Sequence, residues 1–495
     1  MSLIGIDVGS SSIKVASYSE DGKLLALFRQ DLTPQHPYPG AWLQDPEEVW
    51  NTTLIGMESI LENEQLNLDP PRAIAISASG RENFLADAEG NPIGPCIMAG
   101  DLRGEEFEFI PEGTNLPEPF SLECGHKRER MDPVNRLLWW RKHHPKTFEK
   151  AKSFPGWFEF LALRFAGRNV ADKSTAGRWM VYDLKSENWS LERVSEYDID
   201  PEILPEVLPY GSVIGQIKSQ VADYLGISQD VMIAVGSMDL ACSAIGAGVS
   251  DLGTAGLVSG SFENLLIPTV NFPTPSMLLK GLSVTPHPGI SGIAIYALSP
   301  TGTMVLNWAR NLLGLSIQEL NSKLDNIGSD PSPILAVPYL SGAFLNWKDS
   351  RKLRGALFGL TLATSHIDIT QAFMESIAYD HVITLSLLKY EGVFVERIRA
   401  AGGGSRSDWW TQLKADLMGI PIEIVDQVEP GTFGAALLAG LAIGSYDDIG
   451  EVSKKFSGTR KIYNPNLERA DLHKERFESY QEAIPNLHSV ISESG

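Results

Sequence analysis

Short apolar runs that end in small residues recur along this chain. The run LIGIDV, residues 3–8, contains β-branched residues and leads directly into Gly9 and three serines. The run TAGLV, residues 254–258, ends in a similar SGS turn and is followed at once by further apolar residues. β-Branched residues favour strands, whereas glycine and serine favour tight turns. Both segments therefore predict a strand, a small-residue turn and a second strand.

A third segment combines strand and helix patterns around three glycines. Its sequence predicts a strand at Arg397–Ala401, a turn at residues 402–404, a helix at Ser407–Met418 and another strand at Ile420–Val425. Glycines between a strand and a helix N-terminus let backbone amides and the helix dipole meet a nucleotide. The sequence contains no GxxxxGK[ST] loop, which excludes the P-loop class of nucleotide-binding enzymes.

The first turn carries groups that suit a phosphate. Glycine can adopt backbone angles closed to other residues, and turn amides, serine hydroxyls and an ammonium can all face an anion. Asp7, at the strand end, is placed to hold a hydrated divalent cation beside the same phosphates. The alternative is an ordinary hairpin turn in which the serines bond their own backbone. The phosphate-binding candidates of this turn are Gly9, Ser10, Ser11, Ser12 and Lys14.

Composition and charge narrow the class of protein. The chain has 495 residues, 43% of them apolar, which is enough for two or more sizeable cores. Its net charge of −21 argues against nucleic acid and anionic membrane surfaces as partners. Three widely spaced cysteines, the lack of a signal-peptide pattern and the lack of an apolar span of bilayer length favour the cytoplasm.

The repeated strands and turns indicate two related halves. The first is expected to span residues 1–247 and the second residues 248–495. A glycine-rich segment, GAGVSDLGTAG, joins them at residues 246–256 and is a candidate crossover and hinge. A plain linker would have the same composition.

Eight motifs, in this order, resemble the FGGY-type carbohydrate kinases. They are DVGSSSIK, AWLQDPEEVW, ISASGRENFLADAEGNPI, AVGSMDLACSAIGAG, the SGS turn, PYLSGAFLNWKDSRKLRGALFGLTLATSHIDITQAFMESIAYD, AGGGSRSDWWTQLKADLMG and GTFGAALLAG. This family shares its ATPase core with actin, hexokinase and the 70-kDa heat-shock proteins. The resemblance implies an α/β protein with two duplicated ribonuclease-H-like domains, a cleft between them, and ATP and Mg²⁺ as cofactors.

Asp239 is the candidate general base. The segment VMIAVGSM predicts a buried strand and LACSAIGAG a tightly packed helix start, so Asp239 is expected where a strand delivers a side chain to a cleft. The resemblance implies that this aspartate takes a proton from the attacking sugar hydroxyl. An aspartate before an apolar helix can instead be a simple N-cap.

Arg81 and Glu82 are the candidate sugar-binding pair. They follow a predicted strand at Ile74–Ser77 and offer a planar donor fork beside a carboxylate, which can read two vicinal hydroxyls. A surface ion pair is the alternative. Arg-Glu at this position resembles glycerol kinases, whereas xylulokinases usually show Met-His.

The chain departs from the glycerol kinase pattern in three places. Ala99 stands where many members carry a tryptophan, and Leu240 stands where glycerol kinases have a glutamine. The segment CGHKRERMDPVNRLLWW lacks their usual tyrosine motif. An open pocket wall at Ala99 is expected to admit a substrate bulkier than glycerol.

The donor site is expected to draw residues from both halves. Residue-wise comparison implies that Lys14 and Ser11 contact the transferred phosphate, and that the turn of Gly260 and Ser261 contacts the phosphates from the opposite half. The residues expected near the adenosine or its phosphates are Thr303, Asn307, Gly402, Gly403, Gly404 and Ser407.

These observations predict an enzyme that transfers the γ-phosphoryl group of ATP to a hydroxyl of a small sugar. A pentulose such as xylulose or ribulose is the leading candidate, with glycerol or another polyol as the alternative. A catalytically silent nucleotide-binding regulator or an actin-like assembly protein is a third interpretation. The partners expected are the small-molecule substrate and a second copy of the chain in a homodimer, with no nucleic acid and no membrane.

Overall fold

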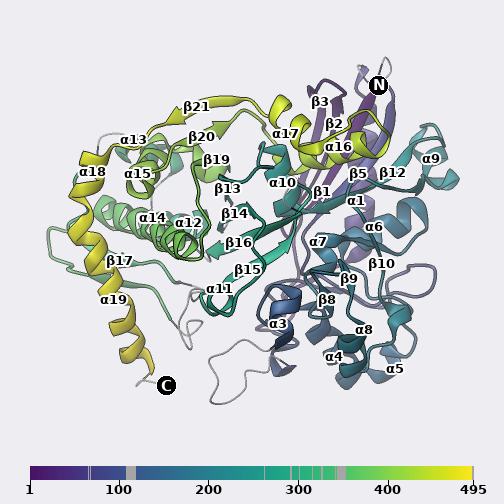
Figure 1. The fold of residues 1–495 in the computed structure, drawn as a ribbon, viewed down its shortest axis with the longest axis horizontal. Coiled ribbons are helices and arrows are strands. Elements are labelled where there is room, and N and C mark those ends of the chain that lie inside the picture. The colour runs from purple at the N-terminus through teal and green to yellow at the C-terminus, as the bar shows by residue number, and fades with distance from the viewer. Residues whose placement is uncertain are drawn as a thin grey trace. The chain divides into compact units, whose positions relative to one another are not determined.

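The chain folds into two compact units (Figure 1). The computed structural model describes residues 1–64, 66, 69–107, 119–260, 262–289, 292–299, 301–314, 316–324, 327–340, 342 and 353–492. The first unit comprises Met1–Ser250, Val284–Ala294 and Glu429–Ser457; the second comprises Asp251–Ser283, Ile295–Val428 and Gly458–Gly495. The expected boundary at residue 247 lies close to the first change of unit. Two later segments nevertheless belong to the first unit. The second of them, Glu429–Ser457, contains a helix that packs on the sheet of this unit.

A mixed six-stranded sheet forms the centre of the first unit. Its order is β11-β12-β5-β1-β2-β3. β1 pairs antiparallel with β2 and parallel with β5, and β5 pairs parallel with β12. The strands are β1 Ser2–Val8, β2 Ser12–Ser19, β3 Leu24–Asp31, β5 Pro71–Ala78, β11 Val213–Gln216 and β12 Met232–Met238. The predicted strand, turn and strand at the start of the chain are thus confirmed.

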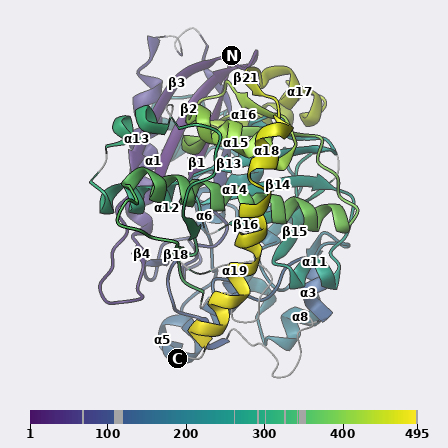
Figure 2. The ribbon, with the colours of Figure 1, turned by 90° about the vertical axis from the view of Figure 1, so that its left-hand side faces the viewer.

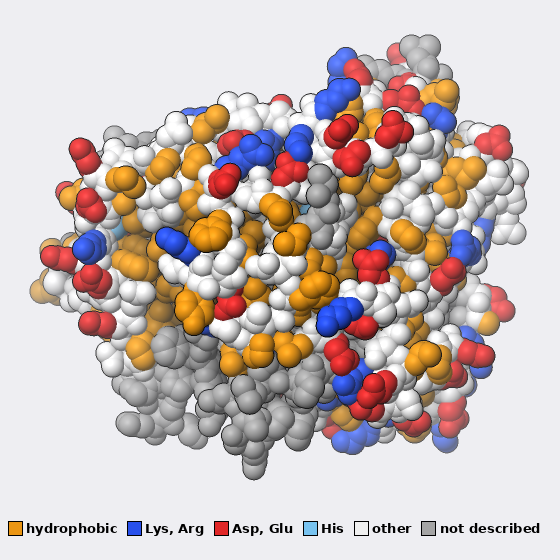
Figure 3. Space-filling model, viewed as in Figure 1, with side chains coloured by type: hydrophobic (Ala, Val, Ile, Leu, Met, Phe, Trp, Pro, Cys, Tyr) orange, Lys and Arg blue, Asp and Glu red, His pale blue; other side chains and the backbone are white. Residues whose placement is uncertain are grey.

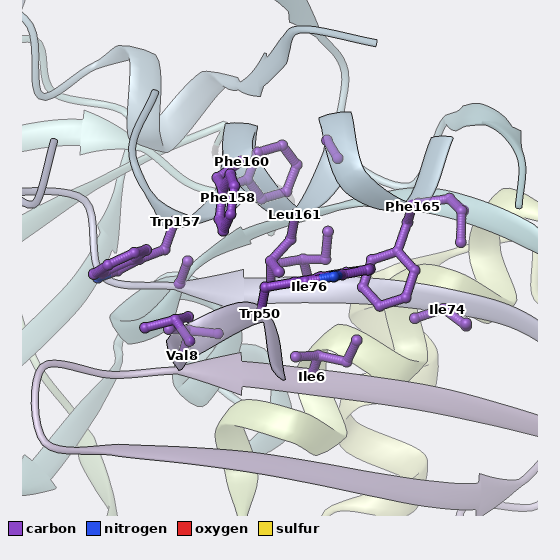
Figure 4. Packing of buried hydrophobic residues seen from close by; sticks show 14 of the residues in the cluster. Ile6, Val8, Trp50, Ile74, Ile76, Trp157, Phe158, Phe160, Leu161 and Phe165 are labelled. Carbon is purple, nitrogen blue, oxygen red and sulfur yellow. The ribbon is translucent and has the colours of Figure 1, made fainter. Parts of the chain in front are cut away.

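The two faces of this sheet are buried by different helices. Ile6 and Val8 of β1 lie in one core with α1 (Pro46–Leu61) and α6 (Trp157–Ala166). Figure 4 shows Trp50 of α1 and the aromatic side chains of α6 on one side of the sheet. Ala73 and Ala75 of β5 lie in another core with α10 (Asp239–Gly246) and α16 (Pro430–Ala442). Residues that alternate along a strand point to opposite faces, which explains the two cores.

α16 approaches the sheet closely through glycine. A Cβ atom at Gly5 would lie 1.8 Å from the backbone oxygen of Thr432. A Cβ atom at Gly434 would lie 1.9 Å from the backbone oxygen of Cys242 in α10. Only glycine permits such contacts, because real side-chain atoms are excluded at these distances. The beginning of α16 is therefore held against the end of β1.

Some of the remaining elements of the first unit pack around a separate apolar core that includes Leu85, Trp140 and Trp179, and others pack on the two cores of the sheet. The described elements are β4 Leu43–Gln44, β6 Cys96–Ile97, η1 Glu105–Phe107, α3 Pro119–Cys124, α4 Pro133–His143, α5 Pro145–Phe148, β7 Val170–Asp172, α7 Lys173–Ala176, β8 Tyr182–Asp183, β9 Asn188–Trp189, α8 Leu191–Glu196, η2 Pro201–Ile203, β10 Glu206–Leu208, α9 Ser219–Leu225 and α17 Ile449–Phe456. All three cysteines are buried and unpaired with one another.

The second sheet repeats the strand order of the first. It runs β15-β16-β14-β13-β19-β20-β21. β13 pairs antiparallel with β14 and parallel with β19, and β19 pairs parallel with β20. In the first sheet, β1 pairs in the same way with β2 and β5, and β5 pairs with β12. The strands are β13 Thr254–Ser259, β14 Glu263–Thr269, β15 Leu282–Pro286, β16 Ile293–Ser299, β19 Arg397–Gly402, β20 Ile422–Val425 and β21 Thr459–Tyr463. The repeated order confirms the predicted duplication.

Helices complete the second unit. α12, α14 and α15 share an apolar core, and α19 packs beside α14 at the C-terminal end of the chain (Figure 2). The remaining bounds are α11 Pro275–Leu279, α12 Thr303–Leu312, α13 Ile317–Leu324, β17 Leu335–Val337, β18 Ala356–Phe358, α14 His366–Tyr390, η4 Gly403–Arg406, α15 Asp408–Met418, α18 Leu467–Leu472 and α19 Lys474–Ser492. Among the described helices, none has the length and apolar character needed to cross a membrane.

Candidate active site

The first candidate phosphate turn joins β1 to β2. The Gly9 N–H donates to the backbone oxygen of Ser12 at 3.0 Å, while Ser10 and Ser11 are exposed and Ser12 is buried in β2. Gly9 does not have the positive φ that would require glycine, so the expectation based on its backbone freedom is wrong. A Cβ atom there would meet only the Ser12 oxygen, at 3.6 Å, among the described atoms. The lack of a side chain at Gly9 keeps the turn open.

Lys14 is held between two carboxylates. Its Nζ lies 2.9 Å from Glu429 Oε2 and 3.4 Å from Asp7 Oδ2. Burial alone would lower the pKa of Lys14, but Asp7 and Glu429 outweigh it and the pKa is raised. The ammonium therefore keeps its charge at neutral pH and is oriented beside the turn.

Asp7 lies where β1 meets the beginning of α16. Ser77 Oγ of the neighbouring strand donates to Asp7 Oδ1 at 2.6 Å. A Cβ atom at Gly431, in the first turn of α16, would lie 3.0 Å from Asp7 Oδ2, so the glycine leaves room for the carboxylate. The helix N-terminus favours a negative charge at this point.

The surroundings of Asp7 suit a hydrated Mg²⁺ rather than a metal held by a protein cage. In the described residues, no group of three or more His, Cys, Asp or Glu side chains is arranged to hold a metal ion. Mg²⁺ commonly uses one or two carboxylates together with water and substrate phosphates. Asp7 fits this role with its second oxygen, which faces the Lys14 ammonium.

Asp239 is the first residue of α10, directly after β12. Met238, not Asp239, occupies the N-cap position, and Asp239 Oδ1 accepts a hydrogen bond from the Leu240 N–H at 2.7 Å. The simple N-cap interpretation is therefore wrong. Burial, Asp7 and Glu82 together raise the pKa of Asp239 to about 7. A carboxyl group with this pKa can accept a proton near neutral pH.

A hydroxyl bridge fixes the end of β12 just before Asp239. Ser174 Oγ accepts a hydrogen bond from the Met238 N–H at 2.9 Å and lies 2.9 Å from Ser237 Oγ. Ser174 is itself held by the buried Asp172 at the start of α7. No local sequence pattern marks these residues, because the contacts join segments far apart in the chain.

Arg81 and Glu82 do not form a surface ion pair with each other. Glu82 is buried, and its Oε2 accepts the backbone N–H of Arg81 at 3.1 Å. The Arg81 guanidinium lies 3.0 Å from Glu129 and 2.5 Å from Asp132. Burial would lower the pKa of Arg81, but Glu129 and Asp132 outweigh it and the pKa is raised. The surface-pair alternative is therefore wrong.

Ala99 follows a segment that is tied to Arg81. The buried Arg136 guanidinium donates to the backbone oxygens of Arg81, Ile97 (3.0 Å) and Met98 (2.7 Å). Ala99 itself is half-buried. A Cβ atom at the next residue, Gly100, would lie 1.7 Å from the indole ring of Trp42. An indole therefore packs on the residue beside Ala99, although position 99 itself has none.

In the second unit, Gly260 and Thr303 are joined directly. The N–H and Oγ1 of Thr303 both donate to the backbone oxygen of Gly260, at 3.2 and 2.6 Å. Thr303 begins α12 and Asn307 is exposed one turn later. Gly260 is exposed between β13 and β14, whereas Ser261 lies outside the described residues. Thr303 therefore supports the turn by binding its carbonyl group.

The three glycines lie between a strand and a helix, as predicted, but they do not form a simple turn, because Gly402 is the last residue of β19. Gly402 has φ +96°, and Gly403 and Gly404 begin the short helix η4. Ser407 is the N-cap of α15 and accepts the Trp410 N–H at 3.4 Å. Ser407 thus already has a capping role, and its contact with adenosine stays a prediction.

The main residues that sequence reasoning missed are partners of the candidates. Glu429 stands just before α16 and two residues before the motif GTFGAALLAG. Glu129 and Asp132 lie in the segment noted only for lacking a tyrosine. A carboxylate that pairs with a distant cation leaves no local pattern. The conspicuous charges of CGHKRERMDPVNR were the only available signal.

Two sheets that repeat one strand order, each with a hairpin turn of small residues, define the fold of the actin and hexokinase-like ATPases. The sequence profile of the FGGY family of carbohydrate kinases, N-terminal domain, matches residues 2–246, and that of its C-terminal domain matches residues 298–443. The chain therefore belongs to the FGGY family of carbohydrate kinases and is a carbohydrate kinase.

Relatives with several sugar specificities cover nearly the whole chain. The chain is 25% identical to xylulose kinase of Staphylococcus xylosus over 97% of this chain and 99% of that protein. It is 23% identical to L-xylulose/3-keto-L-gulonate kinase of Escherichia coli (99% and 98%) and 26% identical to glycerol kinase of Ralstonia pickettii (94% and 94%). The structure of xylulose kinase from Lactobacillus acidophilus is similar in fold, with TM-score 0.89, 23% identity and full coverage of both chains.

Proposed function

We propose that this kinase transfers the γ-phosphoryl group of ATP to a hydroxyl of a neutral sugar, with a pentulose such as xylulose or ribulose as the preferred class. The observation that carries the proposal is Asp239: a carboxyl directly after β12, whose pKa is raised to about 7 by burial, Asp7 and Glu82. Phosphoryl transfer asks the protein mainly for positioning and charge stabilisation.

Each candidate residue has a task in the proposed mechanism. Asp239 accepts the proton of the attacking hydroxyl, and Arg81 and Glu82 orient the sugar through neighbouring hydroxyls. Lys14 balances charge on the transferred phosphate, and Asp7 would hold the hydrated Mg²⁺ that neutralises the phosphate oxygens. Gly260 and the segment at residues 402–404 supply backbone groups to the nucleotide.

The charges near the candidate sugar site favour a neutral acceptor over a sugar acid. The strongest electrostatic neighbours of Asp239 are two carboxylates and the Arg178 guanidinium. Arg81 already faces the carboxylates of Glu129 and Asp132. An added carboxylate on the substrate would enter surroundings with an excess of negative charge, which is costly in a buried site.

Glycerol or another polyol is the second candidate, because a neighbouring arginine and glutamate can read two vicinal hydroxyls on either class. A reducing compartment such as the cytoplasm is also part of the proposal, since the three cysteines are free.

A screen of acceptors tests the proposal. ADP release is measured with MgATP and D-xylulose, L-xylulose, ribulose, hexuloses, glycerol and aldonic acids. We expect a neutral pentulose to give the highest kcat/KM. A preference for an aldonic acid would contradict the charge argument, and no stimulation by any acceptor would favour a nucleotide-binding regulator.

A further inference from the structure

A buried ionic cluster lies at the base of the turn between β13 and β14. Glu263, the first residue of β14, accepts hydrogen bonds through Oε1 from Ser259 Oγ at 2.5 Å and from Lys414 Nζ. Its Oε2 lies 2.7 Å from His381 Nε2. All four side chains are buried, and they come from β13, β14, α14 and α15. We call Ser259, Glu263, His381 and Lys414 the Glu263 cluster.

The Glu263 cluster lies directly below both glycine segments of the candidate donor site. Ser259 immediately precedes Gly260, and Ser259 and Glu263 are opposite each other across the hairpin. A Cβ atom at Gly404 would lie 2.8 Å from Ser259 Cβ and 3.3 Å from Glu263 Oε1. A Cβ atom at Gly402 would lie 2.5 Å from the Ser259 backbone oxygen. A shift of Ser259 or Glu263 would therefore move both segments.

The stability of the fold does not by itself require charged side chains in the Glu263 cluster. Removing a carboxylate and an ammonium from water is costly, and apolar side chains of similar volume often stabilise a core as well or better. Burial raises the pKa of Glu263, but Lys414 and His381 outweigh it and lower the pKa to about 2, so the carboxylate is charged at neutral pH. What charged hydrogen bonds add is a defined geometry.

We propose that Glu263 is a positioning residue for the donor nucleotide. It binds Ser259 and is itself held by His381 and Lys414, so it fixes the positions at which Gly260 and Gly404 bind the phosphates. The inference rests on the proposed ATP-dependent function. The buried ion pair of Glu263 and Lys414 would then affect nucleotide affinity, although Glu263 does not contact the nucleotide.

Two variants separate positioning from stability. Ser259→Ala removes the bond between the turn and Glu263 with the smallest change in volume. Glu263→Leu with Lys414→Met removes both charges together, so no unpaired charge stays buried. We expect the Kd of MgADP, measured by calorimetry, to rise about fivefold in the first variant and about tenfold in the second, as loss of one or two buried hydrogen bonds implies. The KM for the best acceptor of the screen should stay within about twofold.

Glu375→Gln is the matched control. Glu375 is a buried carboxylate of α14 that accepts hydrogen bonds from the Ser332 N–H and from Gln371, neither of them in the Glu263 cluster. Its substitution should leave the Kd of MgADP unchanged whatever its effect on the melting temperature.

Equal losses in nucleotide and acceptor affinity, or an unchanged Kd of MgADP in folded Ser259→Ala, would overturn the inference. If the double variant does not fold, Ser259→Ala decides the question. If the wild-type protein binds no MgADP, the proposed function fails first and the inference falls with it.

Discussion

Asp239 has surroundings that set the pH range in which it can accept a proton. Its pKa of about 7 means that the carboxylate form is lost as the pH falls through neutrality. We therefore expect kcat/KM for the sugar to decrease about tenfold for each pH unit below 7, with one ionising group responsible. The measurement is a pH profile from 5.5 to 9, with the melting temperature followed at each pH. A profile that stays flat down to pH 5.5 in folded protein would rule out the assigned pKa.

Ala99 permits a test of substrate size at the residue scale. The Arg136 guanidinium ties the segment before Ala99 to Arg81, so we expect an indole at position 99 to enter the candidate acceptor site. Ala99→Trp should lower kcat/KM for the best pentulose by more than it lowers the value for glycerol, since a large flat wall leaves less room for the longer substrate. An equal loss for both substrates would remove Ala99 from the pocket.

At the element scale, the packing of α16 on β1 brings Glu429 to Lys14 and Gly431 to Asp7. In Gly5→Ala, the new methyl group would lie 1.8 Å from the Thr432 backbone oxygen, so helix or strand must move. Overpacking of this kind costs about 1–3 kcal/mol. Gly328→Ala is the control, because a Cβ atom there would meet nothing within 4 Å. Thermal or urea unfolding of both variants measures the difference; equal stability would show that α16 adjusts without cost.

Elements were easier to predict than contacts between them. The apolar runs and small-residue turns predicted β1, β2, β13, β14, β19 and α15 close to their observed bounds, because strand and helix periodicity and turn chemistry are local. Glu429 could not be paired with Lys14 in this way, since more than 400 residues separate them. The wrong interpretation of Gly9 has a similar cause: the sequence shows where a glycine stands, but not whether its φ is positive.

At the scale of the whole molecule, the duplicated strand order, the order of eight motifs and two family profiles lead to one class of enzyme. The net charge of −21 did not by itself identify a partner. On the described part of the face in Figure 3, acidic and basic side chains are interspersed. The proposed chemistry depends instead on local charges, such as Lys14 between two carboxylates in the first unit.

The central claim is that Asp239 is the general base of a sugar kinase, and Asp239→Asn tests it most directly. Asparagine keeps the shape but cannot accept the proton, so kcat with MgATP and the best acceptor should fall by about 10² to 10⁴. The melting temperature of Asp239→Asn, in contrast, should not fall. A carboxyl with a raised pKa in the folded state destabilises that state increasingly as the pH rises toward 7, so Asp239→Asn should melt at a temperature equal to or above that of the wild type at pH 8.

Steady-state kinetics and thermal melting of one preparation at pH 8 give both results. Greatly reduced turnover in a folded variant that melts no earlier than the wild type is the predicted outcome. Turnover within about threefold of the wild type, far short of the range for general-base catalysis, would contradict the account.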